Sequence, residues 1–166
     1  MYGGISLIGW FHTIIGTAGI ISGIYLLIRY KFINIWSSLG MFYIVCTLLV
    51  SGSSLFIFSA TGKFNDAHIL SILTILAIIG AFILDRFSQF GFLTKYLKEL
   101  ALSVTILFSM LPTTAEVLKR LPPKNSFVDS IYDPLIMKFY MSYLVIYAVF
   151  AIYQIFLIKG GSYNDK

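Results

Sequence analysis

The stretch from residue 5 to residue 28, ISLIGWFHTIIGTAGIISGIYLLI, contains no Asp, Glu, Lys or Arg and decides the class of fold. A helix needs about 20 consecutive, mainly apolar residues, each adding about 1.5 Å, to cross the hydrocarbon core of a bilayer. This stretch has that length and composition. Its residues do not alternate between polar and apolar, as those of a membrane β-barrel strand do. It therefore predicts a membrane-spanning helix with one histidine, His12, inside it.

Four further segments have a similar apolar composition, so the chain is expected to contain five spans. The predicted spans cover about residues 5–28, 35–58, 67–84, 100–118 and 135–158. Pro112 and the polar residues after it interrupt the fourth, so the alternative is four spans with this segment packed against them. Asn65 and Asp66 are expected to cap the third helix, and Pro134 to begin the fifth. We predict a single all-α integral membrane domain, a bundle of five transmembrane helices with a four-helix core plus one.

The composition of the whole chain agrees with this class. Of the 166 residues, 58% are hydrophobic and only 11% are charged, whereas a soluble domain carries about 25% charged residues. The formal net charge is +5, but the Lys and Arg residues are scattered between apolar runs, so nucleic acid is not an expected partner. Cys46 is a lone cysteine in an apolar stretch and is expected to be inert. The expected surroundings are the lipid bilayer, and the expected location is the cell membrane.

The distribution of Lys and Arg between the two sides of the bundle gives a prediction of orientation. One side receives seven of them, namely Arg29, Lys31, Arg86, Lys95, Lys98, Lys159 and Lys166. The other side receives five, namely Lys63, Lys119, Arg120, Lys124 and Lys138. Because cytoplasmic loops carry the excess of positive charge, the N-terminus is predicted outside and the C-terminus in the cytoplasm.

The first span carries a stripe of small residues that includes its histidine. The stripe consists of Gly9, His12, Gly16, Gly19 and Gly23, at spacings of three and four residues. Residues at these spacings share one face of a helix. Small residues let another helix, or a flat ligand, approach the backbone closely. We therefore expect His12 to face the bundle interior, and the glycine face to contact other helices, including those of partner subunits.

A second histidine, His68, lies at the start of the third span, and Glu116 lies toward the end of the fourth. Since these spans run in opposite directions, both residues and His12 are expected in the same half of the bundle. Two histidines could hold haem iron, or with Glu116 a divalent metal ion, or could form a quinone or proton-relay site. The candidate cofactor-binding residues are thus His12, His68, Gly16 and Gly19, with one haem b as the candidate cofactor, and the candidate metal ligands are His12, His68 and Glu116.

The depth of the two histidines argues against the simplest haem arrangement. His12 lies seven residues beyond Ile5, roughly 10 Å along the helix, whereas His68 is one residue into its span. For both to reach one iron, the first helix has to begin farther out or the third has to begin deeper. No comparable polar group is expected at the opposite end, where Asp85 and Arg86 are interpreted as an interfacial ion pair.

Several short motifs resemble a family of small prokaryotic multi-span membrane proteins of uncharacterised function. The motifs are His12 with Gly16, KFINIWSSLGMFY at the second span, AHILSILTIL at the third and AEVLKRLP at the end of the fourth, within about the first 122 residues. The resemblance implies helix-end histidines similar to those of small b-type cytochromes, and His12 and His68 match two such positions. Trp36 stands where the resemblance implies a histidine, and none occurs near Lys95, so two of the implied histidines are absent.

Three functions follow from these features. The favoured one is an accessory subunit of a larger membrane complex, such as a respiratory or redox complex, because the chain is small and its loops are short. The alternatives are an electron-transfer protein that uses His12 and His68 with haem or quinone, and a transporter or channel. The sequence contains no phosphate-binding loop and no Ser-His-Asp set, which argues against a hydrolase.

Overall fold

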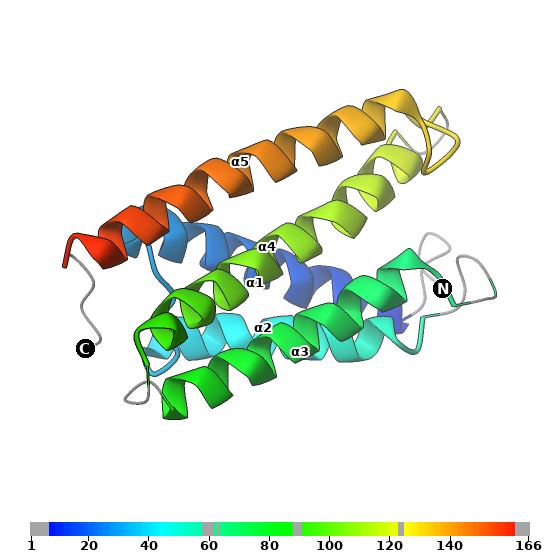
Figure 1. Cartoon of the computed structure of the whole chain (residues 1–166). Helices are drawn as coiled ribbons and strands as arrows, with labels where there is room; N and C mark the ends of the chain where they lie inside the picture. The colour runs from blue at the N-terminus through cyan, green and yellow to red at the C-terminus, as the bar shows by residue number, and fades with distance from the viewer. Residues whose placement is uncertain (1–6, 58–61, 63, 88–90, 123–124, 162–166) are drawn as a thin grey trace.

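The computed structural model describes residues 7–57, 62, 64–87, 91–122 and 125–161. Within these ranges the elements of regular secondary structure are α-helices, and there is no strand. The helices are α1 (Leu7–Tyr30), α2 (Ser38–Ser54), α3 (Asp66–Arg86), α4 (Phe92–Arg120) and α5 (Pro134–Lys159). Each runs antiparallel to the next, so both ends of the bundle combine residues from distant parts of the sequence (Figure 1). The prediction of five helices is confirmed.

Helices α1 to α4 form a closed ring of contacts. Helix α1 packs on α2, α2 on α3 and α3 on α4, and α4 returns to contact α1. Among the described helices, α5 packs on α4 only and lies outside the ring (Figure 1). The described part of the chain is therefore a four-helix core with one additional helix.

The helix starts follow the expected capping chemistry. The side chain of Asn65 accepts a hydrogen bond from the backbone N–H of Ala67, at 3.0 Å, and so begins α3. Asp133 accepts from the N–H of Leu135 in the same way, at 2.8 Å, and Pro134 occupies the first turn of α5. Both satisfy N–H groups that have no partner within the helix. These observations confirm the roles predicted for Asn65 and Pro134.

Helix α4 is longer than predicted and is not broken at Pro112. It begins at Phe92, well before the expected start at residue 100, and continues to Arg120. A proline removes one backbone donor, but hydroxyl groups and neighbouring helices can compensate inside a packed helix. The Thr113 hydroxyl donates to the Ser109 carbonyl at 2.7 Å, one residue after the Phe108 carbonyl to which an N–H at position 112 would donate. Helix α4 is therefore continuous through Pro112, and it is long and apolar enough to cross a membrane.

Helix α2 is the short one instead. It has 17 residues, from Ser38 to Ser54, against a prediction of 35–58. At about 1.5 Å per residue it is roughly 25 Å long, whereas the other four helices are long and apolar enough to cross a membrane. The prediction was too long because apolar residues such as Ile35 and Phe56 continue past both helix ends. The predicted boundaries at residues 5 and 58 lie outside the described residues.

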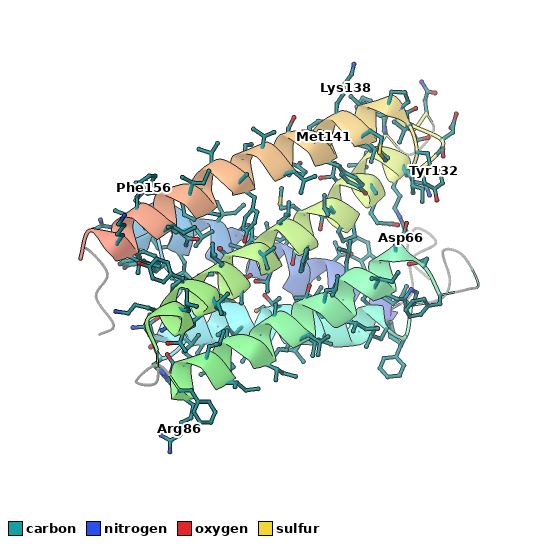
Figure 2. All side chains as sticks on the ribbon, viewed as in Figure 1. Asp66, Arg86, Tyr132, Lys138, Met141 and Phe156 are labelled. Carbon is teal, nitrogen blue, oxygen red and sulfur yellow. The ribbon has the colours of Figure 1, made fainter. Side chains whose placement is uncertain are left out.

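Apolar side chains occupy both the core of the bundle and much of the outer surface of its helices. The core cluster includes Leu26, Tyr43, Ile78 and Leu102, all with at most 2% of their surface exposed. Large apolar side chains also project outward along all five helices (Figure 2). Hydroxyl groups are buried among the helices, namely those of Ser22, Tyr43, Thr47, Ser51, Ser71, Thr74, Ser103 and Thr105. This distribution suits a bilayer, where the outer surface faces hydrocarbon rather than water.

Candidate functional site

His12 is half-buried and contacts α2 near one end of the bundle. Its Nδ1 lies 3.0 Å from the hydroxyl oxygen of Ser53. That hydroxyl donates its own hydrogen to the Val50 carbonyl at 3.0 Å. A serine hydroxyl has one hydrogen, so when Ser53 donates it to Val50, Ser53 accepts from His12 and Nδ1 is the donor nitrogen of the imidazole. In the neutral ring, Nε2 then carries the lone pair, which is the form that a metal ligand or a proton acceptor needs.

His68 is only 2% exposed and belongs to the cap of α3. Its Nδ1 lies 2.9 Å from the side-chain oxygen of Asn65 and 3.3 Å from the Asn65 backbone nitrogen. The two residues form a capping box, in which each side chain contacts the backbone of the other. The ring of Phe64 lies 5.1 Å from that of His68. This environment gives His68 a structural role at the start of the helix.

Glu116 lies on the surface of α4, where it pairs with a neighbouring arginine. It is 49% exposed and forms an ion pair with Arg120, one turn farther along α4. It is near enough to His12 to interact with it electrostatically. The described residues contain no group of three His, Cys, Asp or Glu side chains that could hold a metal ion. His12, His68 and Glu116 therefore share one end of the bundle, here called the histidine end, without assembling a three-ligand site there.

The glycine stripe of α1 faces α2 of the same chain. A Cβ atom at Gly19 would lie 3.3 Å from that of Cys46, and one at Gly23 would lie 2.6 Å from the ring of Tyr43. Gly16 is in ordinary contact distance of Val50. The inward direction predicted for the stripe is thus correct for Gly19 and Gly23, which are buried. This face of α1 is therefore covered by α2 of the same chain.

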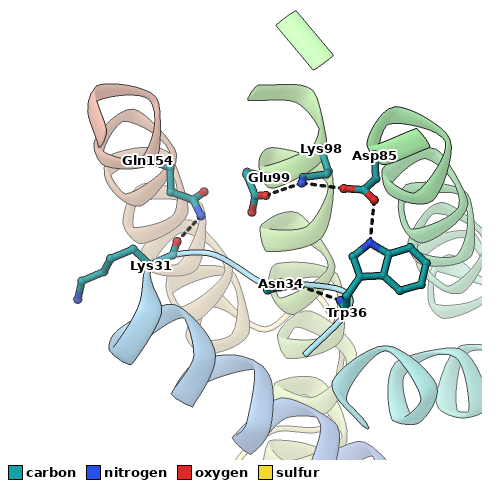
Figure 3. Close-up of polar contacts among 7 residues, drawn as sticks. All are labelled: Lys31, Asn34, Trp36, Asp85, Lys98, Glu99 and Gln154. Carbon is teal, nitrogen blue, oxygen red and sulfur yellow. Dashed lines mark hydrogen bonds and ion pairs between the residues drawn. The ribbon is translucent and has the colours of Figure 1, made fainter. Parts of the chain in front are cut away.

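The opposite end of the bundle holds a charged cluster that the sequence analysis missed. It consists of Trp36, Asp85, Lys98 and Glu99, and we call it the Lys98 cluster (Figure 3). The Lys98 ammonium lies 2.9 Å from a carboxylate oxygen of Asp85 and 3.5 Å from one of Glu99. The side chains of Lys98 and Glu99 are 9% and 3% exposed. The partner of Asp85 is thus Lys98, not Arg86 as expected.

Trp36 connects this cluster to the segment between α1 and α2. Its indole N–H donates to the second carboxylate oxygen of Asp85, at 2.9 Å. Both oxygens of Asp85 are therefore engaged, one by a cation and one by a neutral donor. At the position where the resemblance implied a histidine, the structure has a hydrogen-bond donor to a carboxylate.

Gln154 makes a second polar connection at the same end, here called the lysine end. It lies near the C-terminal end of apolar α5, yet it is fully buried. Its amide nitrogen donates to the Lys31 carbonyl at 2.7 Å (Figure 3). Its amide oxygen accepts from the Ser103 hydroxyl at 3.0 Å. One side chain thus joins α5 to α4 and to the end of α1.

A sequence signal existed for both features. A single glutamine in an apolar span is expected to face other helices, because burying an amide in lipid is unfavourable. A short connection makes α3 and α4 antiparallel neighbours, which brings Asp85 and Lys98 opposite each other. The local sequence does not reveal the contribution of Trp36, which comes from a segment 49 residues away.

Comparisons of the chain with models of protein families, with curated proteins and with solved structures found no match. The resemblance to small multi-span membrane proteins with helix-end histidines stays a prediction.

Proposed function

We propose that this chain is an integral membrane protein and that it serves as an accessory subunit of a larger assembly in the cell membrane. Four apolar helices of sufficient length support insertion, together with the apolar outer surface. The buried polar groups of the described core make hydrogen bonds and ion pairs within the chain, as a structural subunit requires.

The observation that carries the subunit proposal is that α5 packs on a single described helix, whereas each of α1 to α4 contacts at least two. This helix packs on α4 and leaves an apolar stripe uncovered along its outer side. The stripe consists of Met141, Val145, Ala148, Ile152 and Ile155, all exposed, at alternating spacings of four and three residues. Such spacing is the pattern by which one helix packs along another. Because α2 fills the glycine face of α1, we place the subunit contact on this stripe, with a transmembrane helix of another protein as its partner.

Photo-crosslinking from the native membrane tests this proposal. A photoreactive residue placed at position 148 should give one crosslinked product of defined mass, and Ala148→Trp should remove the protein from its assembly on a native gel. Ile79 on α3 is also exposed and apolar and provides the matched control position. A diffuse pattern of lipid adducts at both positions, with a single small species on the gel, would contradict the subunit proposal.

A second candidate function is electron transfer at the histidine end. The observation that favours it is the 3.0 Å contact between His12 Nδ1 and the Ser53 hydroxyl, because histidines that bind metals or cofactors commonly use their other nitrogen for a hydrogen bond of this kind. A bound b-type haem would supply one-electron redox chemistry, with His12 and His68 as its ligands. The space for the ring would have to lie away from Gly16 and Gly19.

The test is a reduced-minus-oxidised visible spectrum of purified, haem-supplemented protein. A sharp α-band that is lost in both His12→Ala and His68→Ala would support the electron-transfer candidate. A flat spectrum from folded protein would remove haem and leave His12 as a packing residue or a hydrogen-bond partner of a quinone.

A further inference from the structure

The lysine end of the bundle carries a group of exposed or half-exposed cations. We call this set the cationic rim, and it consists of Arg29, Lys31, Arg86, Lys95 and Lys159, which are exposed or half-exposed. They come from the ends of α1, α3 and α5, from the segment after α1 and from the first turn of α4. The antiparallel arrangement brings them to one end of the bundle (Figure 1).

The described carboxylates of this end pair with Lys98. Its two described acids are Asp85 and Glu99, and both turn toward buried Lys98. Glu99 is only 2% exposed. The Lys98 cluster thus buries the Glu99 carboxylate and engages both oxygens of Asp85, whose side chain is 21% exposed. Both carboxylates therefore pair with Lys98 rather than with a cation of the rim.

The histidine end has a different charge pattern. Its described acids are Asp66, Glu116, Asp129 and Asp133, and its described cations are Lys119, Arg120 and Lys138. Arg120 is paired with Glu116 on the surface. Figure 2 shows Asp66 and Lys138 at this end and Arg86 at the other. Among the described residues, the exposed charges at the histidine end are therefore of both signs. At the lysine end the described rim cations are accompanied only by the partly exposed Asp85, which is paired with Lys98.

We propose that the cationic rim binds the headgroups of anionic phospholipids in the leaflet that it faces. This inference rests on the proposed membrane insertion. Lys and Arg at the ends of membrane helices attract anionic lipid surfaces, and the contributions of nearby cations add. Phosphate oxygens accept the hydrogen bonds that ammonium and guanidinium groups donate.

The aromatic residues at this end support the placement of the rim at headgroup level. Trp36 is 70% exposed although its indole nitrogen is engaged, and Tyr30 is 57% exposed. Trp and Tyr concentrate at the boundary between hydrocarbon and headgroups. The Arg29 guanidinium lies 5.8 Å from the centre of the Tyr30 ring, so it is held at the depth of this aromatic residue. The rim is therefore within reach of lipid phosphates rather than far out in water.

The experiment compares neutral and anionic lipids on the full chain. The protein is reconstituted into phosphatidylcholine vesicles with and without phosphatidylglycerol, and lipids retained after mild detergent extraction are counted by native mass spectrometry. The rim variant combines Arg86→Gln, Lys95→Gln and Lys159→Gln. The control variant removes the same charge at the histidine end through Lys119→Gln, Arg120→Gln and Lys138→Gln.

The wild type and the control variant should retain phosphatidylglycerol over phosphatidylcholine, and the rim variant should lose this preference by about tenfold or more. Equal loss in both variants would show an effect of total charge and overturn the proposal, as would a wild type without preference. Flotation of the vesicles on a density gradient tests insertion separately. A wild type that floats with neither kind of vesicle would contradict the proposed membrane insertion. Thermal unfolding of each variant in detergent separates loss of binding from loss of fold.

Discussion

The ammonium group of Lys98 lies 2.9 Å from a carboxylate oxygen of Asp85, which precedes it by thirteen residues. This contact joins the last turn of α3 to the second turn of α4, and the Trp36 indole binds the same carboxylate from the other side. Removing charges from water is unfavourable, so a buried ion pair adds little stability by itself. Removal of one partner of such a pair is strongly destabilising, because the remaining charge then stays buried without a counter-ion.

Replacement of Lys98 by methionine tests this asymmetry. Lys98→Met keeps the length of the side chain but leaves Asp85 and Glu99 without their shared cation. We expect the free energy of unfolding to fall by about 3–5 kcal/mol, as for other buried pairs from which one partner is removed. The measurement is unfolding of the purified protein in mixed micelles with increasing denaturing detergent.

Lys95→Met is the matched control, because Lys95 is half-exposed on the same helix and belongs to the rim rather than the cluster. It should change the stability by less than about 1 kcal/mol. The triple variant Asp85→Asn, Lys98→Met, Glu99→Gln should recover part of the loss, because it leaves no isolated charge. Equal stability of Lys98→Met and the wild type would show that the cluster is not a closed ionic unit.

Gly40 should not tolerate a side chain. It lies in the first turn of α2, where a Cβ atom would overlap the carbonyl oxygen of Asn34 and approach the Ser37 hydroxyl to 2.9 Å. That hydroxyl caps α2 by accepting from the Gly40 N–H at 3.0 Å. Gly40→Ala must therefore displace backbone, and we expect a loss of at least about 1–3 kcal/mol.

Gly52 provides the comparison within the same helix. A Cβ atom there meets nothing within 4 Å, so Gly52→Ala should be neutral or slightly stabilising. Thermal unfolding of both variants in one detergent gives the measurement. If Gly40→Ala and Gly52→Ala unfolded at the same temperature, the result would contradict the close approach of Gly40 to the Asn34 carbonyl.

Gln154 should control the attachment of α5. Gln154→Leu removes the hydrogen bond to the Lys31 carbonyl and the one from the buried Ser103 hydroxyl, so both groups lose this partner. We expect a loss of about 1–3 kcal/mol and a local effect, because α5 packs on α4 only among the described helices.

Hydrogen–deuterium exchange with mass spectrometry resolves the location of this effect. Peptides from the last turns of α5 should exchange faster in Gln154→Leu, while peptides from α2 and α3 should not change. The neighbouring residue Tyr153 is 43% exposed, so Tyr153→Leu should leave exchange of α5 unchanged. Uniformly faster exchange along the whole chain would point to global destabilisation instead.

The helices that could be placed from sequence are those whose apolar runs end at polar residues. Helices α1, α3 and α5 begin and end within two residues of their predicted limits or at the edge of the described ranges. The limits of α2 were wrong, because its flanking segments are themselves apolar, and hydropathy does not separate a buried loop from a helix. The start of α4 was wrong for the opposite reason, since Lys98 and Glu99 look like residues outside the membrane until their partners are known.

The candidate site was predictable only in part. Helical spacing placed the glycine stripe on one face and directed it inward, but it could not identify α2 as the helix that fills this face. Antiparallel topology placed both histidines at one end, but their hydrogen bonds depend on Ser53 and Asn65, which the pattern does not link to them as partners. The Lys98 cluster needs three separate segments, and no single window of sequence contains it.

The contact between Asn65 and His68 allows the structural role of His68 to be measured apart from any role in binding. Asn65→Ala and His68→Ala should each cost about 1 kcal/mol, because each removes part of one capping box. Since both residues act through the same contact, the double variant should cost less than the sum of the two single variants. Unfolding in mixed micelles gives the four free energies of this cycle. His12→Ala leaves the cap intact and provides the control, because its effect on the free energy of unfolding should add to that of Asn65→Ala. Strict additivity of Asn65→Ala and His68→Ala would show that the box does not form, and the burial of His68 would then have to be explained by what it binds.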